Sequence, residues 1–143
     1  MIKSLIINKY LTIEFIKVVI NMILIFFCLG FIMNLFEEIN FFKDIDIGIY
    51  VPILVSSLVV PSYLYNMFPF IILISGIWFF ARIKKSDEVT ALKISGISNF
   101  AIIIIPSLTA VILGIIFVTS INPITSVLVK KYEIIKGRYE RDR

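Results

Sequence analysis

Residues 81–98 read ARIKKSDEVTALKISGIS, a short polar stretch between two long apolar runs. It carries charges of both signs, and Ser86 is of the residue type that caps helix N-termini. The two acids that follow it suit the positive end of a helix dipole, and Gly96 is a typical helix stop. We therefore expect a short helix over residues 86–95, held just outside a membrane.

Three uncharged runs of the chain are long enough to cross a membrane. They cover residues 18–36, 47–81 and 94–129, which are 19, 35 and 36 residues long. A helix needs about 20 apolar residues to cross the hydrocarbon core. The chain of 143 residues is 59% hydrophobic and only 17% charged, which excludes an ordinary soluble domain. The expected fold class is an all-α integral membrane protein with three transmembrane helices.

The composition also excludes several kinds of site. The chain has no histidine and one cysteine, Cys28, so an internal disulfide, a cysteine-based metal site and the commonest general base are all missing. No G-x-x-x-x-G-K-S/T motif for nucleotide binding is present, and no intramembrane pair of ionisable residues suggests a proton-coupled carrier or hydrolase. The net charge of +4 lies at segment ends and gives little support for nucleic-acid binding. We expect no catalytic residue, metal or cofactor.

The distribution of Lys and Arg predicts the orientation. Residues 1–17 hold three lysines and residues 82–93 hold four bases, whereas residues 37–46 hold one lysine against four acids. Because cytoplasmic loops carry the excess of positive residues, the N-terminus and the 82–93 loop are expected in the cytoplasm. The acidic loop is expected on the other side.

The expected segments follow in chain order. They are an amphipathic lead-in (1–17), a first span (18–36), a periplasmic loop (37–50), a long second span kinked at Pro61 and Pro69 (51–83), a cytoplasmic helix (84–98), a third span (100–121) and a polar periplasmic extension (122–143).

Several short stretches carry a resemblance to a known family. They are KYLTIEF at 9–15, LFEE at 35–38, PSYLY at 61–65, FPF at 68–70, SDEVTALKISGIS at 86–98 and the pair Asn122-Pro123. In this order and spacing, they resemble the LptF/LptG permease family of lipopolysaccharide export. The resemblance covers essentially the whole chain, and residues 86–98 are its most specific part.

The resemblance implies an architecture and a set of partners. Family members place a periplasmic β-jellyroll domain between two sets of three spans, so we expect the N-terminal half, with residues 122–143 leading toward a missing jellyroll domain. The implied location is the inner membrane of a Gram-negative bacterium, as a multi-pass protein. The implied partners are a cytoplasmic ABC ATPase dimer, a second LptF/LptG-type permease subunit, a periplasmic lipopolysaccharide-carrier component, lipopolysaccharide and membrane lipids. The implied function is a non-catalytic permease subunit that extracts lipopolysaccharide for export to the outer membrane.

The resemblance also implies candidate site residues. The 86–96 helix becomes a coupling helix that docks in a groove of the ATPase, with Glu88 meeting a basic group and Ile94 adding apolar contact. The candidate ATPase-coupling residues are Asp87, Glu88, Val89, Ala91, Leu92 and Gly96. Lys130 and Lys131 are candidates for contact with lipid A phosphate, since an ammonium group is an effective phosphate partner. Two simpler interpretations stay open: a solvated loop whose charges enforce topology, and lysines that reach the membrane surface.

Two other functions also stay open. One is a small structural or assembly membrane protein with no transport activity of its own. The other is a self-assembling pore, which needs a polar stripe along one span. The polar residues available for such a stripe are scattered: Asn21, Ser56, Ser57, Ser75 and Thr109.

Overall fold

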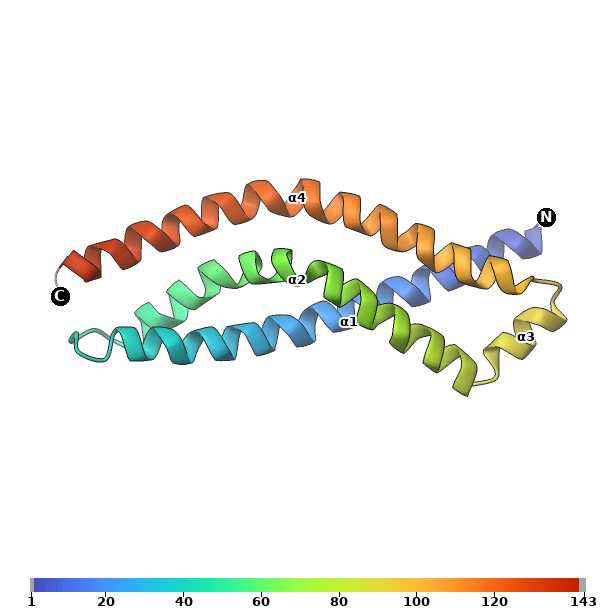
Figure 1. Ribbon diagram of the computed structural model, residues 1–143, viewed down its shortest axis with the longest axis horizontal. Coiled ribbons are helices and arrows are strands. Elements are labelled where there is room, and N and C mark those ends of the chain that lie inside the picture. The colour runs from blue at the N-terminus through green and yellow to red at the C-terminus, as the bar shows by residue number, and fades with distance from the viewer. Residues whose placement is uncertain (1, 142–143) are drawn as a thin grey trace. The chain divides into compact units, whose positions relative to one another are not determined.

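The computed structural model of the chain describes residues 2–141, which are helical apart from short connections. The described residues form the helices α1 (Ile2–Phe41), α2 (Tyr50–Lys85), α3 (Glu88–Ile94) and α4 (Asn99–Arg141), in this order along the chain (Figure 1). Helices α1, α2 and α4 are each long and apolar enough to cross a membrane. The expected fold class, with three spanning helices and a short helix between the second and third, is confirmed.

Helix α1 extends further than the apolar pattern indicates. It continues through Glu37 and Glu38 and ends at Phe41. The non-helical connection to α2 is therefore limited to residues 42–49, inside the 37–50 loop that the sequence predicts. As a consequence, the two acids are presented from a helix rather than from an irregular loop.

The prolines of the spans lie inside helices. Helix α2 remains helical through Pro61 and Pro69, and α4 remains helical through Pro106 and Pro123. Each proline removes one backbone donor, a loss that membrane helices tolerate where neighbouring groups satisfy the freed carbonyl. The third span therefore has no helix end at Asn122-Pro123, and its polar extension continues the same helix.

The three long helices each contribute one segment to each of two compact units. The first unit contains residues 2–23 and 69–116, and therefore includes α3. The second unit contains residues 24–68 and 117–141. Each unit has its own set of side-chain contacts.

The core of the first unit combines side chains from all four helices. The rings of Phe15 and Phe79 meet edge to face, with their centroids 5.5 Å apart, an arrangement worth about 0.5–1.5 kcal/mol beyond the area it buries. The buried apolar residues of this core are Leu11, Phe15, Val18, Val19, Phe79, Ile83, Leu92 and Ile102. Since Leu92 belongs to α3, the short helix is part of this core.

The second unit is held by apolar and aromatic contacts of its own. Val55 and Val60 of α2 are fully buried. The ring of Phe68 stacks on that of Phe117, with a centroid separation of 4.0 Å and nearly parallel planes. These contacts fix the α2 and α4 segments of this unit against each other.

Three hydroxyl groups of α2 and α4 are satisfied inside their own helices. The hydroxyls of Ser57, Ser75 and Thr109 donate to the carbonyl oxygens four residues earlier, over 2.9, 2.6 and 2.8 Å. Local bonding of this kind is how such side chains are accommodated in a helix surrounded by hydrocarbon. Hydroxyls engaged in this way do not supply the polar stripe that a pore requires.

Candidate functional site

Helix α3 begins one residue later than its cap signal indicates. The residue before it is Asp87, with φ 58° and ψ 13°, and the Asp87 side chain makes no capping hydrogen bond. The Ser86 hydroxyl donates instead to the carbonyl of Arg82, over 2.9 Å. The prediction that Ser86 caps this helix is therefore wrong, because its hydroxyl bonds back to the last turn of α2.

The end of α3 follows the sequence signal. Gly96 has φ 90°, a left-handed conformation that glycine adopts without steric cost. The Gly96 amide donates to the carbonyl of Lys93 over 3.0 Å, and the Ile97 amide donates to that of Leu92 over 3.2 Å. This pair of bonds is a Schellman motif, which satisfies carbonyls that the helix end leaves free.

One face of α3 is packed against its own chain. Leu92 is 8% exposed and belongs to the first unit's core, while Val89 and Ile97 pack against that core. Two of the candidate coupling residues, Val89 and Leu92, therefore hold α3 in place instead of presenting an apolar surface outward.

Polar contacts from α1 reinforce this attachment. The Tyr10 hydroxyl donates to Oε2 of Glu88 over 3.2 Å. One helical turn further along α1, Glu14 accepts a 2.8 Å hydrogen bond from Arg82, and Lys17 lies 3.1 Å from the same carboxylate. Because the Arg82 side chain is 39% exposed, we assign this pair less than about 1 kcal/mol. The ion pair mainly positions the two helices, since it joins the end of α2 to α1.

The other face of α3 is free of the core. Ile94 is 82% exposed, and it lies on the side of the helix opposite Leu92 and Val89. The exposed residues of this outer face are Asp87, Thr90, Ala91 and Ile94. An exposed isoleucine beside a small residue on a firmly mounted helix is suited to contact another protein.

The six candidate coupling residues thus divide between the two faces. Asp87, Ala91 and Gly96 are exposed, Glu88 and Val89 are half-buried, and Leu92 is buried.

The two candidate lysines at the other end of the chain lie on the surface. Lys130 and Lys131 are both exposed on α4. The structure brings a different lysine, Lys136, into contact with an acid of α1.

This second polar cluster consists of Glu38, Tyr132 and Lys136. The Tyr132 hydroxyl donates to Oε1 of Glu38 over 2.8 Å, and the Lys136 ammonium group lies 3.3 Å from the same oxygen. The ammonium group also donates to the Tyr132 oxygen over 2.8 Å. It lies 4.4 Å from the ring centre of Phe41, within cation–π range. The Glu38 side chain is only 2% exposed, so Lys136 and Tyr132 supply the partners that a buried carboxylate requires.

Sequence reasoning missed this cluster. The signal for it is the spacing of Tyr132 and Lys136, which are four residues apart and hence on one face of a helix. The partner acid gives no comparable signal, because Glu37 and Glu38 look equivalent in the sequence.

The buried polar side-chain atoms of the second unit are not all satisfied. Within the described part of the chain, Nδ2 of Asn34, Oε2 of Glu38 and Oγ of Ser56 are buried without a hydrogen-bond partner. All three belong to the second unit. Among the described residues, no group of three His, Cys, Asp or Glu side chains has the arrangement of a metal site.

Comparison with known proteins identifies one family. The family model described as "Lipopolysaccharide export system permease LptF/LptG" matches residues 9–143 of the chain. Searches among curated proteins and among solved structures found no match.

Proposed function

The chain belongs to the LptF/LptG family of lipopolysaccharide export permeases, and from this membership we propose that it provides three membrane helices of a permease subunit in an ABC transporter. The family is a transporter component rather than an enzyme, so the energy comes from a separate cytoplasmic ATPase. The transporter extracts lipopolysaccharide from the inner membrane of a Gram-negative cell for export to the outer membrane. A second permease subunit of the same family and a periplasmic lipopolysaccharide carrier complete the assembly.

The observation that supports this proposal is the way α3 packs and hydrogen-bonds against its own chain. Its inner residue Leu92 is buried in a core shared with α1, α2 and α4, and Tyr10 holds Glu88. These contacts support the proposal that motion of α3 is passed to the three long helices. The outer residues Ala91 and Ile94 remain exposed. This combination supports α3 as the coupling helix, with its outer face as the ATPase contact.

The proposed orientation places α3 in the cytoplasm. The last turn of α2 carries Arg82, Lys84 and Lys85, and α3 carries Lys93. Positive residues of this density favour the cytoplasmic side. The 42–49 connection then lies in the periplasm, and so do Lys130 and Lys131, which we propose as contacts for lipid A phosphate.

The coupling proposal is tested by co-purification from membranes. A tagged chain is expected to recover an ABC ATPase. Ile94→Asp places a charge on the outer face of α3 without touching the core, and we expect it to reduce ATPase recovery at least tenfold. The control is Ile49→Asp, which changes another isoleucine, 69% exposed, in the connection between α1 and α2. Recovery of the inserted chain alone, without an ATPase, supports the structural or assembly alternative instead.

The orientation is tested by thiol labelling in intact spheroplasts. Cys28 is the one native cysteine, so Cys28→Ser gives a cysteine-free background. A membrane-impermeant maleimide is expected to label Ile49→Cys directly and Ile94→Cys only after permeabilisation. The reverse pattern contradicts the proposed topology.

The proposed lipid A contact is tested by measuring how much lipopolysaccharide is extracted. We expect Lys130→Gln with Lys131→Gln to lower lipopolysaccharide extraction from proteoliposomes by about three- to tenfold while ATPase association is unchanged. Lys43→Gln removes another exposed lysine on the same proposed side and serves as the control. Equal extraction by all of these variants removes the two lysines from the substrate path.

A further inference from the structure

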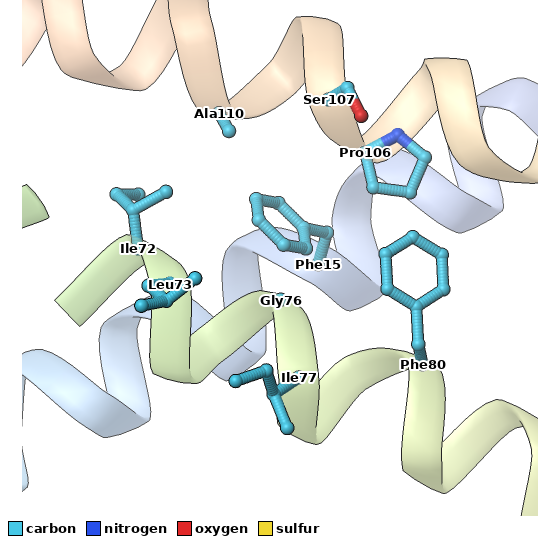
Figure 2. Close-up of a pocket in the computed structure, with 9 residues that line it drawn as sticks. All are labelled: Phe15, Ile72, Leu73, Gly76, Ile77, Phe80, Pro106, Ser107 and Ala110. Carbon is cyan, nitrogen blue, oxygen red and sulfur yellow. The ribbon is translucent and has the colours of Figure 1, made fainter. Parts of the chain in front are cut away.

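An apolar pocket of about 570 Å³ lies in the first unit, between α2 and α4. Figure 2 shows the ring of Phe80 extending from α2 toward Pro106 of α4, with Phe15 of α1 behind the opening and Gly76 on the α2 side. We propose that this pocket holds one acyl chain of a membrane glycerophospholipid, whose phosphate group is bound by Lys84.

The chemistry of the pocket walls fits a hydrocarbon chain. The lining is almost entirely apolar, and the hydroxyl of its one polar side chain, Ser107, donates to the carbonyl of Ile103 over 2.8 Å. Nothing in the lining therefore requires a polar occupant. The pocket lies in parts of α2 and α4 that are apolar enough to span a membrane, so lipid chains are the surrounding medium.

The pocket is suited to a thin chain. An α-helix with its side chains is about 10–12 Å across, whereas an acyl chain is a single unbranched hydrocarbon. Gly76 adds to the available width, because a Cβ built at this position meets no atom within 4 Å. A flexible acyl chain can enter between α2 and α4 without separating them.

The charge that anchors the headgroup comes from α2. Lys84 lies four residues after Phe80 and seven after Ile77, which places it on the same helix face as the pocket, one turn beyond it. Lys84 is exposed, and the described residues offer it no ion pair. Lys85 is rotated about 100° away from this face, and Arg82 is paired with Glu14. Lys84 is thus the base positioned to meet a phosphate whose acyl chain occupies the pocket.

The test is native mass spectrometry of the purified protein, with any partners that co-purify, released from nanodiscs of palmitoyl-oleoyl phosphatidylglycerol and phosphatidylethanolamine. We expect one retained glycerophospholipid per chain. Gly76→Leu fills the pocket and should reduce the retained fraction at least tenfold, and Lys84→Gln should reduce it at least fivefold. Lys84 is exposed, so its substitution tests the site without disturbing the core.

Two matched controls accompany these variants. Lys85→Gln removes the adjacent lysine from a different helix face, and Gly137→Leu adds the same bulk at a glycine that also has open space around it. Both should retain phospholipid within twofold of the unmodified chain. If Gly76→Leu retains as much lipid as Gly137→Leu, or if the unmodified chain retains none, the proposal is overturned.

A photo-crosslink separates the alternative occupants. A photoreactive amino acid in place of Ile77, which lines the pocket and is 63% exposed, should yield an adduct with the mass of a phospholipid. An adduct with a protein would assign the pocket to a partner helix, and one with the mass of lipopolysaccharide would assign it to the substrate. Either result contradicts the proposal. This site does not depend on the coupling role of α3, so the two proposals can fail separately.

Discussion

The Tyr10 hydroxyl of α1 donates a hydrogen bond to the Glu88 carboxylate of α3 across 78 positions of the chain. One turn further along α1, Glu14 holds Arg82 in the last turn of α2. Both ends of the connection between α2 and α3 are therefore tied to consecutive turns of α1. The position of α3 is therefore supported by contacts with α1 as well as by its own connections.

Tyr10→Phe should loosen α3 without unfolding the protein. The variant removes a single hydrogen bond to the Glu88 carboxylate and keeps the ring. Hydrogen bonds to charged groups contribute about 1.5–3 kcal/mol, but this one is 3.2 Å long and exposed to solvent, so we assign it about 1 kcal/mol. We expect amide hydrogen exchange in residues 88–94 to accelerate about three- to tenfold, since exchange there reports local opening.

The control for this measurement is Tyr50→Phe. Tyr50 is 70% exposed at the start of α2, so its hydroxyl is open to the surroundings. Exchange in residues 88–94 should be unchanged in this variant. Equal exchange rates in the two variants would show that the Tyr10 bond does not hold α3.

Two glycines of the first unit should respond in opposite directions to alanine. Gly96 has φ 90°, where a side chain costs roughly 1–2 kcal/mol, so Gly96→Ala should destabilise the end of α3. Gly76 lies inside α2 with open space around it, so Gly76→Ala should stabilise by about 0.5–1 kcal/mol. Reversible unfolding in mixed detergent micelles measures both. Destabilisation by Gly76→Ala of the same size as that by Gly96→Ala would refute this distinction.

Two substitutions at Asp87 separate the role of its charge from the role of its backbone conformation. Its φ of 58° is tolerated by Asp and Asn but is an outlier for β-branched residues. Asp87→Asn should change the free energy of unfolding by less than about 0.5 kcal/mol, whereas Asp87→Val should cost roughly 1–3 kcal/mol. Loss of ATPase recovery in Asp87→Asn at normal stability would assign a coupling role to the charge. Normal recovery would leave Asp87 a purely conformational role.

The sequence predicts where the helices of this protein lie better than it predicts which partner each side chain contacts. The uncharged runs are sufficient to place three spans, and Gly96 is sufficient to end α3. The cap at Ser86 fails for a physical reason. Helix α2 remains helical to Lys85, and the Ser86 hydroxyl turns back to donate to the Arg82 carbonyl, whereas a cap would accept from the first amides of α3. A local signal of this kind cannot tell which of two adjoining helices a side chain will serve.

The same limit explains the lysines of α4. The spacing of Tyr132 and Lys136 indicates that these two residues share a helix face. The packing of α4 against α1 decides that this face, and not that of Lys130 or Lys131, turns inward. That packing depends on partners far away in the sequence, such as Phe42, whose ring meets that of Tyr139 edge to face with the centroids 5.3 Å apart. Which lysine turns inward is therefore determined by the tertiary packing.

The cluster of Glu38, Tyr132 and Lys136 gives the strongest stability prediction. Lys136→Met leaves a carboxylate that is 2% exposed without its cation, and breaking a buried pair in this way costs about 3–5 kcal/mol. Glu38→Gln combined with Lys136→Met removes both charges and keeps an acceptor oxygen for the Tyr132 hydroxyl, so the double variant should recover most of that loss.

The control is Lys131→Met, which changes an exposed lysine of the same helix. It should change the free energy of unfolding by less than about 0.5 kcal/mol. Unfolding in mixed micelles provides all three values. A double variant no more stable than Lys136→Met would mean that the cation stabilises the second unit through its contacts with Phe41 and Tyr132, and not through Glu38.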